Sequence, residues 1–197
     1  MTCPKRFKGC LIILFLLFLV LSFASCAYYK LVAANEEITV GSSLRVKSPI
    51  KWSESKVYGV ETWTIDGPQL QRLMFFTGVE TGKPLFETQG KEAKTFPVFD
   101  HSMTSVEIME LVETSLARMN VHDIKIEDLR PVSFCGQDGF RFELHYKVQS
   151  GLKYNGFFIG TKKDDKLWAV IFFGTDLYHY KKDLKHAEEI VSSAVIL

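Results

Sequence analysis

The residues of this chain that could do chemistry are few and scattered. Asp100, His101 and Ser102 supply the three residue types of a hydrolase triad, but they are consecutive. Consecutive side chains point in different directions, whereas a triad is assembled in space from separate segments. We therefore interpret this tripeptide as a polar turn and not as a catalytic site.

A second group of candidate residues has helical spacing. His179, Asp183 and His186 stand at positions i, i+4 and i+7. The two histidines are then two turns apart, about 10 Å, which is too far for one metal ion with bonds of about 2 Å. Their face lies opposite the apolar stripe of the same segment, so we expect it to be solvated. We predict no metal site and no cofactor.

Cys135 is the one cysteine beyond the amino-terminal region, and it lies in a turn, Phe-Cys-Gly-Gln-Asp-Gly. With His122 or His145 close to it in the fold, its thiol could act as a nucleophile. Cysteine is also among the residues that are most often simply buried. We predict the buried role and no enzymatic activity, and we keep a hydrolase as the third function class.

Four charged or titratable side chains alternate along residues 140–148: Arg141, Glu143, His145 and Lys147. Successive side chains of a strand point to opposite faces, so these four share one face and the apolar residues between them share the other. One interpretation is a solvent-facing sheet surface with cross-strand charge pairs. The other is a face that binds a partner, and we take it as the candidate site.

The amino-terminal residues have the order of an export signal. A basic region without an acid contains Lys5, Arg6 and Lys8, and an apolar run follows at residues 11–21. Small residues then end on a cysteine, in the sequence Phe-Ala-Ser-Cys at residues 23–26. Because the positive charge lies on the amino-terminal side, we expect the rest of the chain to be exported.

The segment Phe-Ala-Ser-Cys resembles the lipobox of bacterial lipoproteins. In that family the cysteine receives a diacylglyceryl chain and becomes a new, usually acylated, amino terminus. The resemblance implies lipidation of Cys26, with residues 1–25 as the signal peptide and residues 26–37 as acylated cysteine and tether. Ala27 follows the cysteine, which implies the periplasmic side of the outer membrane in a host with two membranes.

Two alternatives to the lipoprotein stay open. Residues 10–29 are mostly apolar and long enough to cross a bilayer as an uncleaved signal anchor. The segment could also be an ordinary secretion signal, with Cys26 present by accident. In each case the domain that follows lies outside the cytoplasm.

Length and composition indicate a single folded domain at residues 38–197. The chain has 197 residues, 47% of them hydrophobic, and a net charge of +1. This near-neutral balance lacks the basic footprint of a nucleic-acid-binding protein. Because only one of the four cysteines lies in this domain, a disulfide framework within it is excluded.

Hydrophobic periodicity predicts an α+β fold, with an antiparallel sheet packed against two main helices. Thr104 and Glu107 have the spacing of a capping box, and Pro131 marks an edge or bulged strand. We expect residues 82–99 to form a surface loop. The predicted helices cover residues 104–120 and 177–194, and the predicted strands cover residues 38–40, 44–46, 61–65, 70–79, 124–134, 140–148, 153–161 and 167–173.

The pattern over residues 140–195 resembles the PsbP-type α/β/α sandwich. It consists of an alternating strand, a hairpin ending in Asp-Lys-Leu-Trp-Ala-Val and an aromatic-led helix. Members of that fold, which include an extrinsic protein of photosystem II and a Ran-binding nuclear-import factor, mostly bind or scaffold other proteins. Together the two resemblances imply a membrane-anchored lipoprotein that acts as a non-catalytic binding or assembly accessory for another envelope protein. The alternative is a carrier or sensor of a small apolar ligand, with a pocket between sheet and helix.

Overall fold

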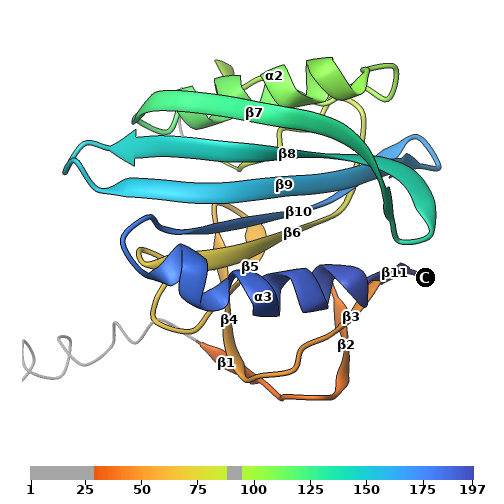
Figure 1. Ribbon diagram of the computed structural model, residues 1–197. Coiled ribbons are helices and arrows are strands. Elements are labelled where there is room, and N and C mark those ends of the chain that lie inside the picture. Colours follow the sequence, from red (N-terminus) through yellow and green to blue (C-terminus); the bar gives the residue numbers. More distant parts are fainter. Residues whose placement is uncertain (1–28, 88–94) are drawn as a thin grey trace, which may run out of the picture.

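The computed structural model describes residues 29–87 and 95–197, and the predicted signal segment with Cys26 lies outside them. In these residues the chain forms two antiparallel sheets and two helices (Figure 1). The larger sheet has the strand order β1 (Lys30–Val32), β4 (Trp52–Val57), β5 (Val60–Thr64), β6 (Gln71–Val79), β10 (Lys166–Thr175), β9 (Lys153–Lys163), β8 (Gln137–Val148) and β7 (Val121–Phe134). The smaller sheet has the order β11 (Val195–Ile196), β3 (Leu44–Lys47) and β2 (Glu37–Val40). The helices are α2 (Ser105–Ala117) and α3 (His179–Ser192). The predicted α+β class is confirmed.

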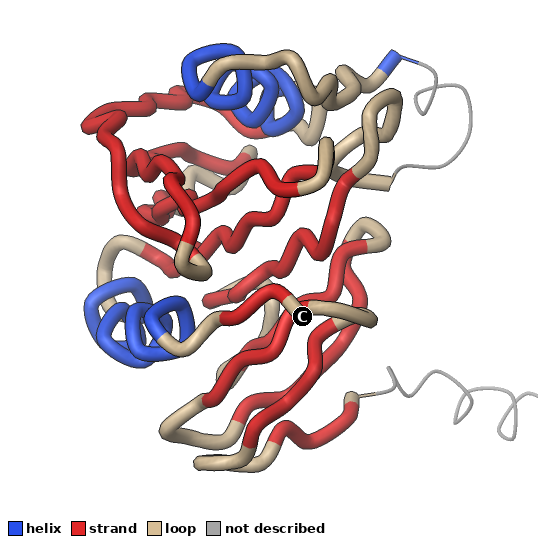
Figure 2. Tube along the Cα trace, turned by 90° about the vertical axis from the view of Figure 1, so that its right-hand side faces the viewer, coloured by secondary structure: helices blue, strands red, loops and turns tan. Residues whose placement is uncertain are grey.

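Strand β10 lies in the middle of the larger sheet and is buried on both faces. Phe172 belongs to the core beside α3 and the smaller sheet, whereas Phe173 belongs to the core beside α2. Burying each such side chain contributes about 1.5–3 kcal/mol. Figure 2 shows the strands running between the two helices. Residues 167–173 show no alternation of apolar and polar side chains, as a strand covered on both faces requires.

Strands β8, β9 and β10 form the three-stranded meander that the sequence predicts. On β8 the apolar residues Phe140, Phe142, Leu144 and Tyr146 are buried toward α2. The turn between β9 and β10 consists of two residues with positive φ, Asp164 and Asp165, which is typical of a tight hairpin.

Helix α2 begins at the predicted capping box. The backbone N–H of Thr104 donates to Glu107 Oε2 at 2.7 Å, and the N–H of Glu107 donates to Thr104 Oγ1 at 3.3 Å. The helix ends at Ala117, three residues before the predicted end at Asn120, which has a left-handed φ of 57°. Val106 is exposed, because the buried face of the helix is centred on Leu111 and Val112.

Strand β7 is the edge strand that Pro131 predicts. Its register against β8 shifts between His122 and Lys125 and again between Glu127 and Arg130, which marks two bulges. Such irregularities discourage another strand from pairing with the free edge.

Two expectations are wrong in part. Residues 82–99 are not only a surface loop, because Leu85, Phe86, Phe96 and Phe99 are buried in the core beside α2; residues 88–94 lie outside the described part. The predicted tether of residues 26–37 contains β1, which pairs with β4 and buries Val32. The folded part therefore begins at Lys30 and not at residue 38. Neither helix of the described residues is long and apolar enough to cross a membrane.

Candidate binding face

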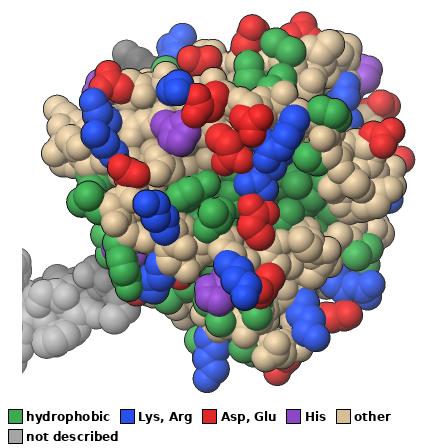
Figure 3. Space-filling model, in the orientation of Figure 1, with side chains coloured by type: hydrophobic (Ala, Val, Ile, Leu, Met, Phe, Trp, Pro, Cys, Tyr) green, Lys and Arg blue, Asp and Glu red, His purple; other side chains and the backbone are tan. Residues whose placement is uncertain are grey.

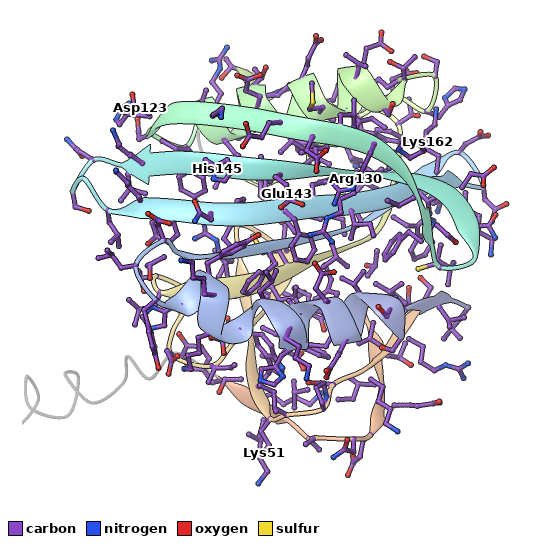
Figure 4. All side chains as sticks on the ribbon, in the orientation of Figure 1. Lys51, Asp123, Arg130, Glu143, His145 and Lys162 are labelled. Atoms are coloured by element: carbon purple, nitrogen blue, oxygen red, sulfur yellow. The ribbon has the colours of Figure 1, made fainter. Side chains whose placement is uncertain are left out.

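Arg141, Glu143, His145 and Lys147 lie on the side of β8 that faces away from α2. Helix α3 packs on the same side of the sheet, chiefly against β10, and leaves uncovered β7 and the part of β8 around His145 and Lys147 (Figure 1). Figure 4 shows Glu143 and His145 on this open side, with Arg130 and Asp123 of β7 beside them. We call the following set the charged face: Asp123, Lys125, Glu127 and Arg130 of β7 with Arg141, Glu143, His145 and Lys147 of β8.

Arg141 is not solvent-facing, although the strand pattern alone suggests it. Its side chain is only 11% exposed, and its guanidinium lies 4.0 Å from the ring centre of Phe157. Nε donates to Glu143 Oε1 at 2.9 Å, while Nη1 and Nη2 donate to the two carboxylate oxygens of Glu188 at 2.9 and 2.8 Å. Burial lowers the pKa of Arg141, but the hydrogen bonds and charges of Glu188 and Glu143 outweigh it and leave the pKa raised. Arg141 therefore joins β8 to α3.

Glu143 connects the ion pair of Arg141 and Glu188 to the rest of the charged face. Its Oε1 also accepts from Arg130 Nη2 at 3.4 Å, and its Oε2 accepts from the Tyr180 hydroxyl at 3.4 Å. Burial, and then the Glu143 charge, raise the pKa of Tyr180 to about 12, so this hydroxyl stays protonated as a donor. Residues Arg141, Glu143 and Tyr180 form an inner half of the face that holds α3 in place.

His145 and Lys147 form a more accessible outer half. His145 Nδ1 lies 2.8 Å from Asn155 Oδ1, and its Nε2 lies 3.3 Å from Glu127 Oε1. Lys147 Nζ, on a side chain that is 41% exposed, donates to Asp123 Oδ2 at 2.6 Å and lowers the pKa of that carboxyl. Exposed pairs of this kind contribute at most about 1 kcal/mol, so their groups can exchange partners at little cost.

Charge on the outer half is balanced. Lys125 and Lys147 stand beside Asp123 and Glu127, and Lys125 pairs with Glu127. Figure 3 shows acidic, basic and histidine side chains mixed over the surface above α3, with hydrophobic side chains below them. Such a surface suits a protein partner with both signs of charge and not a polyanion.

The Asp100-His101-Ser102 segment is the polar turn that the sequence predicts. Asp100 Oδ1 accepts from the backbone N–H of Ser102 at 2.9 Å and from its hydroxyl at 2.6 Å. These two hydrogen bonds lower the pKa of Asp100. The serine hydroxyl thus donates to the carboxylate and not to a histidine, which is the opposite of a triad arrangement.

Cys135 has none of the surroundings of a nucleophile. Burial raises the pKa of its thiol to about 12, so the reactive thiolate is disfavoured. The register pairs Phe134 with Gln137 at one end of β7 and β8, and His122 with Lys147 at the other. At about 3.4 Å per residue, His145 lies roughly 27 Å along β8 from the turn that holds Cys135, and His122 lies farther still.

The expectation of a solvated face with His179, Asp183 and His186 is wrong for Asp183. This carboxyl is 1% exposed and accepts from the buried amide of Gln71 at 3.3 Å. His179 pairs instead with Asp66, with Nε2 3.8 Å from Oδ2. Within the part of the chain that the structure describes, no group of histidine, cysteine and carboxylate side chains could hold a metal ion.

An open groove of about 490 Å³ lies where the start of α2 meets β7 and β8. Phe140 forms its apolar floor and stacks on Phe158 with ring centres 5.5 Å apart. Lys162 stands on its rim, but Nζ already donates to the carbonyls of His101 and Met103 at 3.0 and 2.6 Å. No feature of the sequence pointed to this groove, because its walls come from segments that are far apart in the chain.

Comparisons with known proteins place the chain in no family. No family model matches it, and no curated protein is similar to it in sequence. Among solved structures it is similar to LpqN of Mycobacterium tuberculosis, a protein described as involved in cell envelope biogenesis. The TM-score is 0.37 at 9% identity, with 88% of this chain and 86% of that chain covered. A likeness at this level carries no inference about fold or function, and the resemblance to the PsbP-type sandwich stays a prediction.

Proposed function

We propose that this protein is exported, anchored to a membrane through lipid on Cys26, and binds another envelope protein through the outer half of the charged face. The observation that carries the proposal is that α3 leaves uncovered β7 and the part of β8 around His145 and Lys147, where accessible charges stand in a regular array. The opposite face of the same strands is closed by α2 and a large aromatic core.

The chemistry of the candidate nucleophile supports a binding role over an enzymatic one. Cys135 is held as a thiol and lies far from His122 and His145 along the strands. We therefore assign no catalytic residue, no cofactor and no nucleic-acid partner to the protein.

A second candidate function has one observation in its favour. The groove over Phe140 has a volume within the range of small-ligand sites, about 300–1,000 Å³, and lies between sheet and helix as a carrier of an apolar ligand requires. Its openness to solvent and its rim of Arg130, Asp138 and Lys162 suit a carrier less than a closed apolar pocket would. We rank the carrier second for that reason.

Capture of a partner from the host envelope tests the binding proposal. Reversal of two exposed lysines of this edge, Lys125→Glu with Lys147→Glu, should weaken capture by the tagged protein and leave folding intact. Lys56→Glu with Lys83→Glu reverses two exposed lysines outside the charged face, is matched in charge, and should capture normally. Cys135→Ser should complement a deletion strain. Normal capture by the double reversal, or failure of a folded Cys135→Ser protein, would overturn the proposal.

The anchor is tested separately. A fatty-acid probe should label the wild-type protein and not Cys26→Ala. Equal labelling of both proteins would exclude Cys26 as the lipid site, and the absence of label from the wild-type protein would favour the uncleaved signal anchor or plain secretion.

A further inference from the structure

The distance between the proposed lipid site and the folded domain is short. Only Ala27, Tyr28 and Tyr29 stand between Cys26 and the first residue of β1, Lys30. At about 3.6 Å per residue, four steps span no more than about 14 Å, whatever their conformation. Strand β1 is an edge strand paired with β4, so the constraint acts on one edge of the sheet.

Exposed apolar side chains gather on this edge and at the start of α3. Leu31 on β1 is 65% exposed, and Leu177 and Tyr178 before α3 are 88% and 60% exposed. Strand β1 is four strands from β10, which leads into Leu177, and strands are about 4.8 Å apart, so the two groups lie roughly 20 Å apart. Large aliphatic and aromatic side chains that are exposed at both places are typical of contacts with another surface.

The charges around these exposed side chains indicate which kind of surface they contact. The first half of α3 carries Lys181 and Lys185, which are exposed, and Lys182, which pairs with Asp66. On the opposite side of the sheet, the exposed acids Glu107, Glu110 and Glu113 follow the outer side of α2. Lysines beside exposed leucine and tyrosine suit an anionic bilayer surface, and that surface repels an acidic helix.

We infer that the domain rests on an anionic bilayer surface through β1 and the start of α3, with α2 turned away from the lipid. This inference rests on the proposed anchor at Cys26. The edge strand β7 is seven strands from β1, roughly 34 Å, so that edge of the sheet extends away from the attachment point. Lys51, at the β1 end of the molecule in Figure 4, adds a further exposed cation there.

The test measures how near three positions lie to the lipid. Single cysteines replace Leu31, Leu177 or Glu110 of α2 in a full-length chain whose cysteines other than Cys26 are removed. Each is labelled with a fluorophore, and the lipidated protein is reconstituted in vesicles of phosphatidylcholine and phosphatidylglycerol with a quencher on lipid headgroups. Labels at positions 31 and 177 should be quenched several-fold more strongly than the label at position 110. Equal quenching at 177 and 110 would overturn the inference.

A charge variant separates this surface from the anchor. Lys181→Glu with Lys185→Glu should reduce quenching at position 177 to the level seen in pure phosphatidylcholine, and leave the far-ultraviolet circular dichroism unchanged. Unchanged quenching at position 177 in this variant would overturn the assignment of Lys181 and Lys185 to the surface that contacts the bilayer. The mass of the intact protein reports lipidation independently. If no lipid is found, coupling Cys26 to a maleimide lipid restores the attachment and the same three positions are measured.

Discussion

Arg141 and Lys147 stand six residues apart on the same face of β8, yet the structure predicts very different costs for removing their charges. Arg141→Met keeps an unbranched side chain over Phe157 and removes the guanidinium. Lys147→Met removes an ammonium group of the same charge from a more open position and serves as the matched control. The two variants change net charge equally, so their difference reports the surroundings of each group.

The magnitude follows from the contacts. Arg141 makes hydrogen bonds to two carboxylates, Glu143 and Glu188, and each charge-assisted bond of this kind contributes about 1.5–3 kcal/mol. Glu188 is 37% exposed and Glu143 21%, so both regain part of their hydration when the guanidinium is removed. We expect a net loss of about 2–4 kcal/mol for Arg141→Met. Lys147 has one exposed partner, and we expect a loss below about 1 kcal/mol.

Urea unfolding of residues 27–197, followed by tryptophan fluorescence, measures the difference. With a slope of about 2 kcal/mol per molar urea, Arg141→Met should lower the midpoint by about 1–2 M and Lys147→Met by less than about 0.5 M. Glu188→Gln combined with Arg141→Met should show a coupling of about 1–2 kcal/mol. Equal midpoints for the two single variants, with unchanged slopes, would refute the assignment of Arg141 as the link between β8 and α3.

Three further predictions concern single residues. Burial raises the pKa of Glu61 above its ordinary 4.5, although the hydrogen bond from the Gly41 N–H opposes this shift. As the pH rises, Glu61 therefore loses its proton in the unfolded chain before it does so in the folded one, and the free energy of unfolding falls between pH 4.5 and the folded pKa. Glu61→Gln should therefore unfold at a higher urea midpoint than the wild type near pH 7 and at the same midpoint at acid pH below both pKa values; a lower midpoint near pH 7 would contradict this. Cys135, with its pKa raised to about 12, should resist iodoacetamide near pH 8 in the native protein and react once urea unfolds it, and rapid native alkylation would show an accessible thiolate. Trp168→Ala should lower the free energy of unfolding by about 3–5 kcal/mol, because Trp168 is only 7% exposed and belongs to the core beside α3. A loss below about 1 kcal/mol would mean that this core does not depend on the Trp168 side chain.

Strand periodicity predicts the centre of this fold well because burial there follows from local pattern. Residues 140–148 alternate, and Phe140 and Phe142 are buried as that pattern requires. Residues 167–173 do not alternate, and the strand is covered on both faces. The capping box of α2 is equally local, since Thr104 and Glu107 satisfy one another within a single turn.

The residues whose positions were predicted wrongly are placed by contacts with distant segments. Asp183 is polar and was therefore placed on the solvated face of its helix, but Gln71 lies beneath it and supplies a donor. The apolar residues of the loop at residues 82–99 show no period, so periodicity could not reveal that Phe86 and Phe99 complete the core over α2. Strand β1 has only three residues, too few for a pattern, and its place in the sheet comes from pairing with β4.

The charged face shows why site prediction needs more than a strand pattern. On the sequence alone, reversing the charges of Arg141 and Lys147 together would be expected to leave folding intact, since the strand pattern predicts that both side chains are exposed. In the structure, Arg141→Glu would bring a third carboxylate between Glu143 and Glu188, whereas Lys147→Glu would only oppose Asp123 at the surface. A double reversal would therefore lose partner capture through unfolding and would appear to support binding for the wrong reason. Variants restricted to the outer half, at Lys125 and Lys147, keep the link between β8 and α3 and so separate loss of binding from loss of fold.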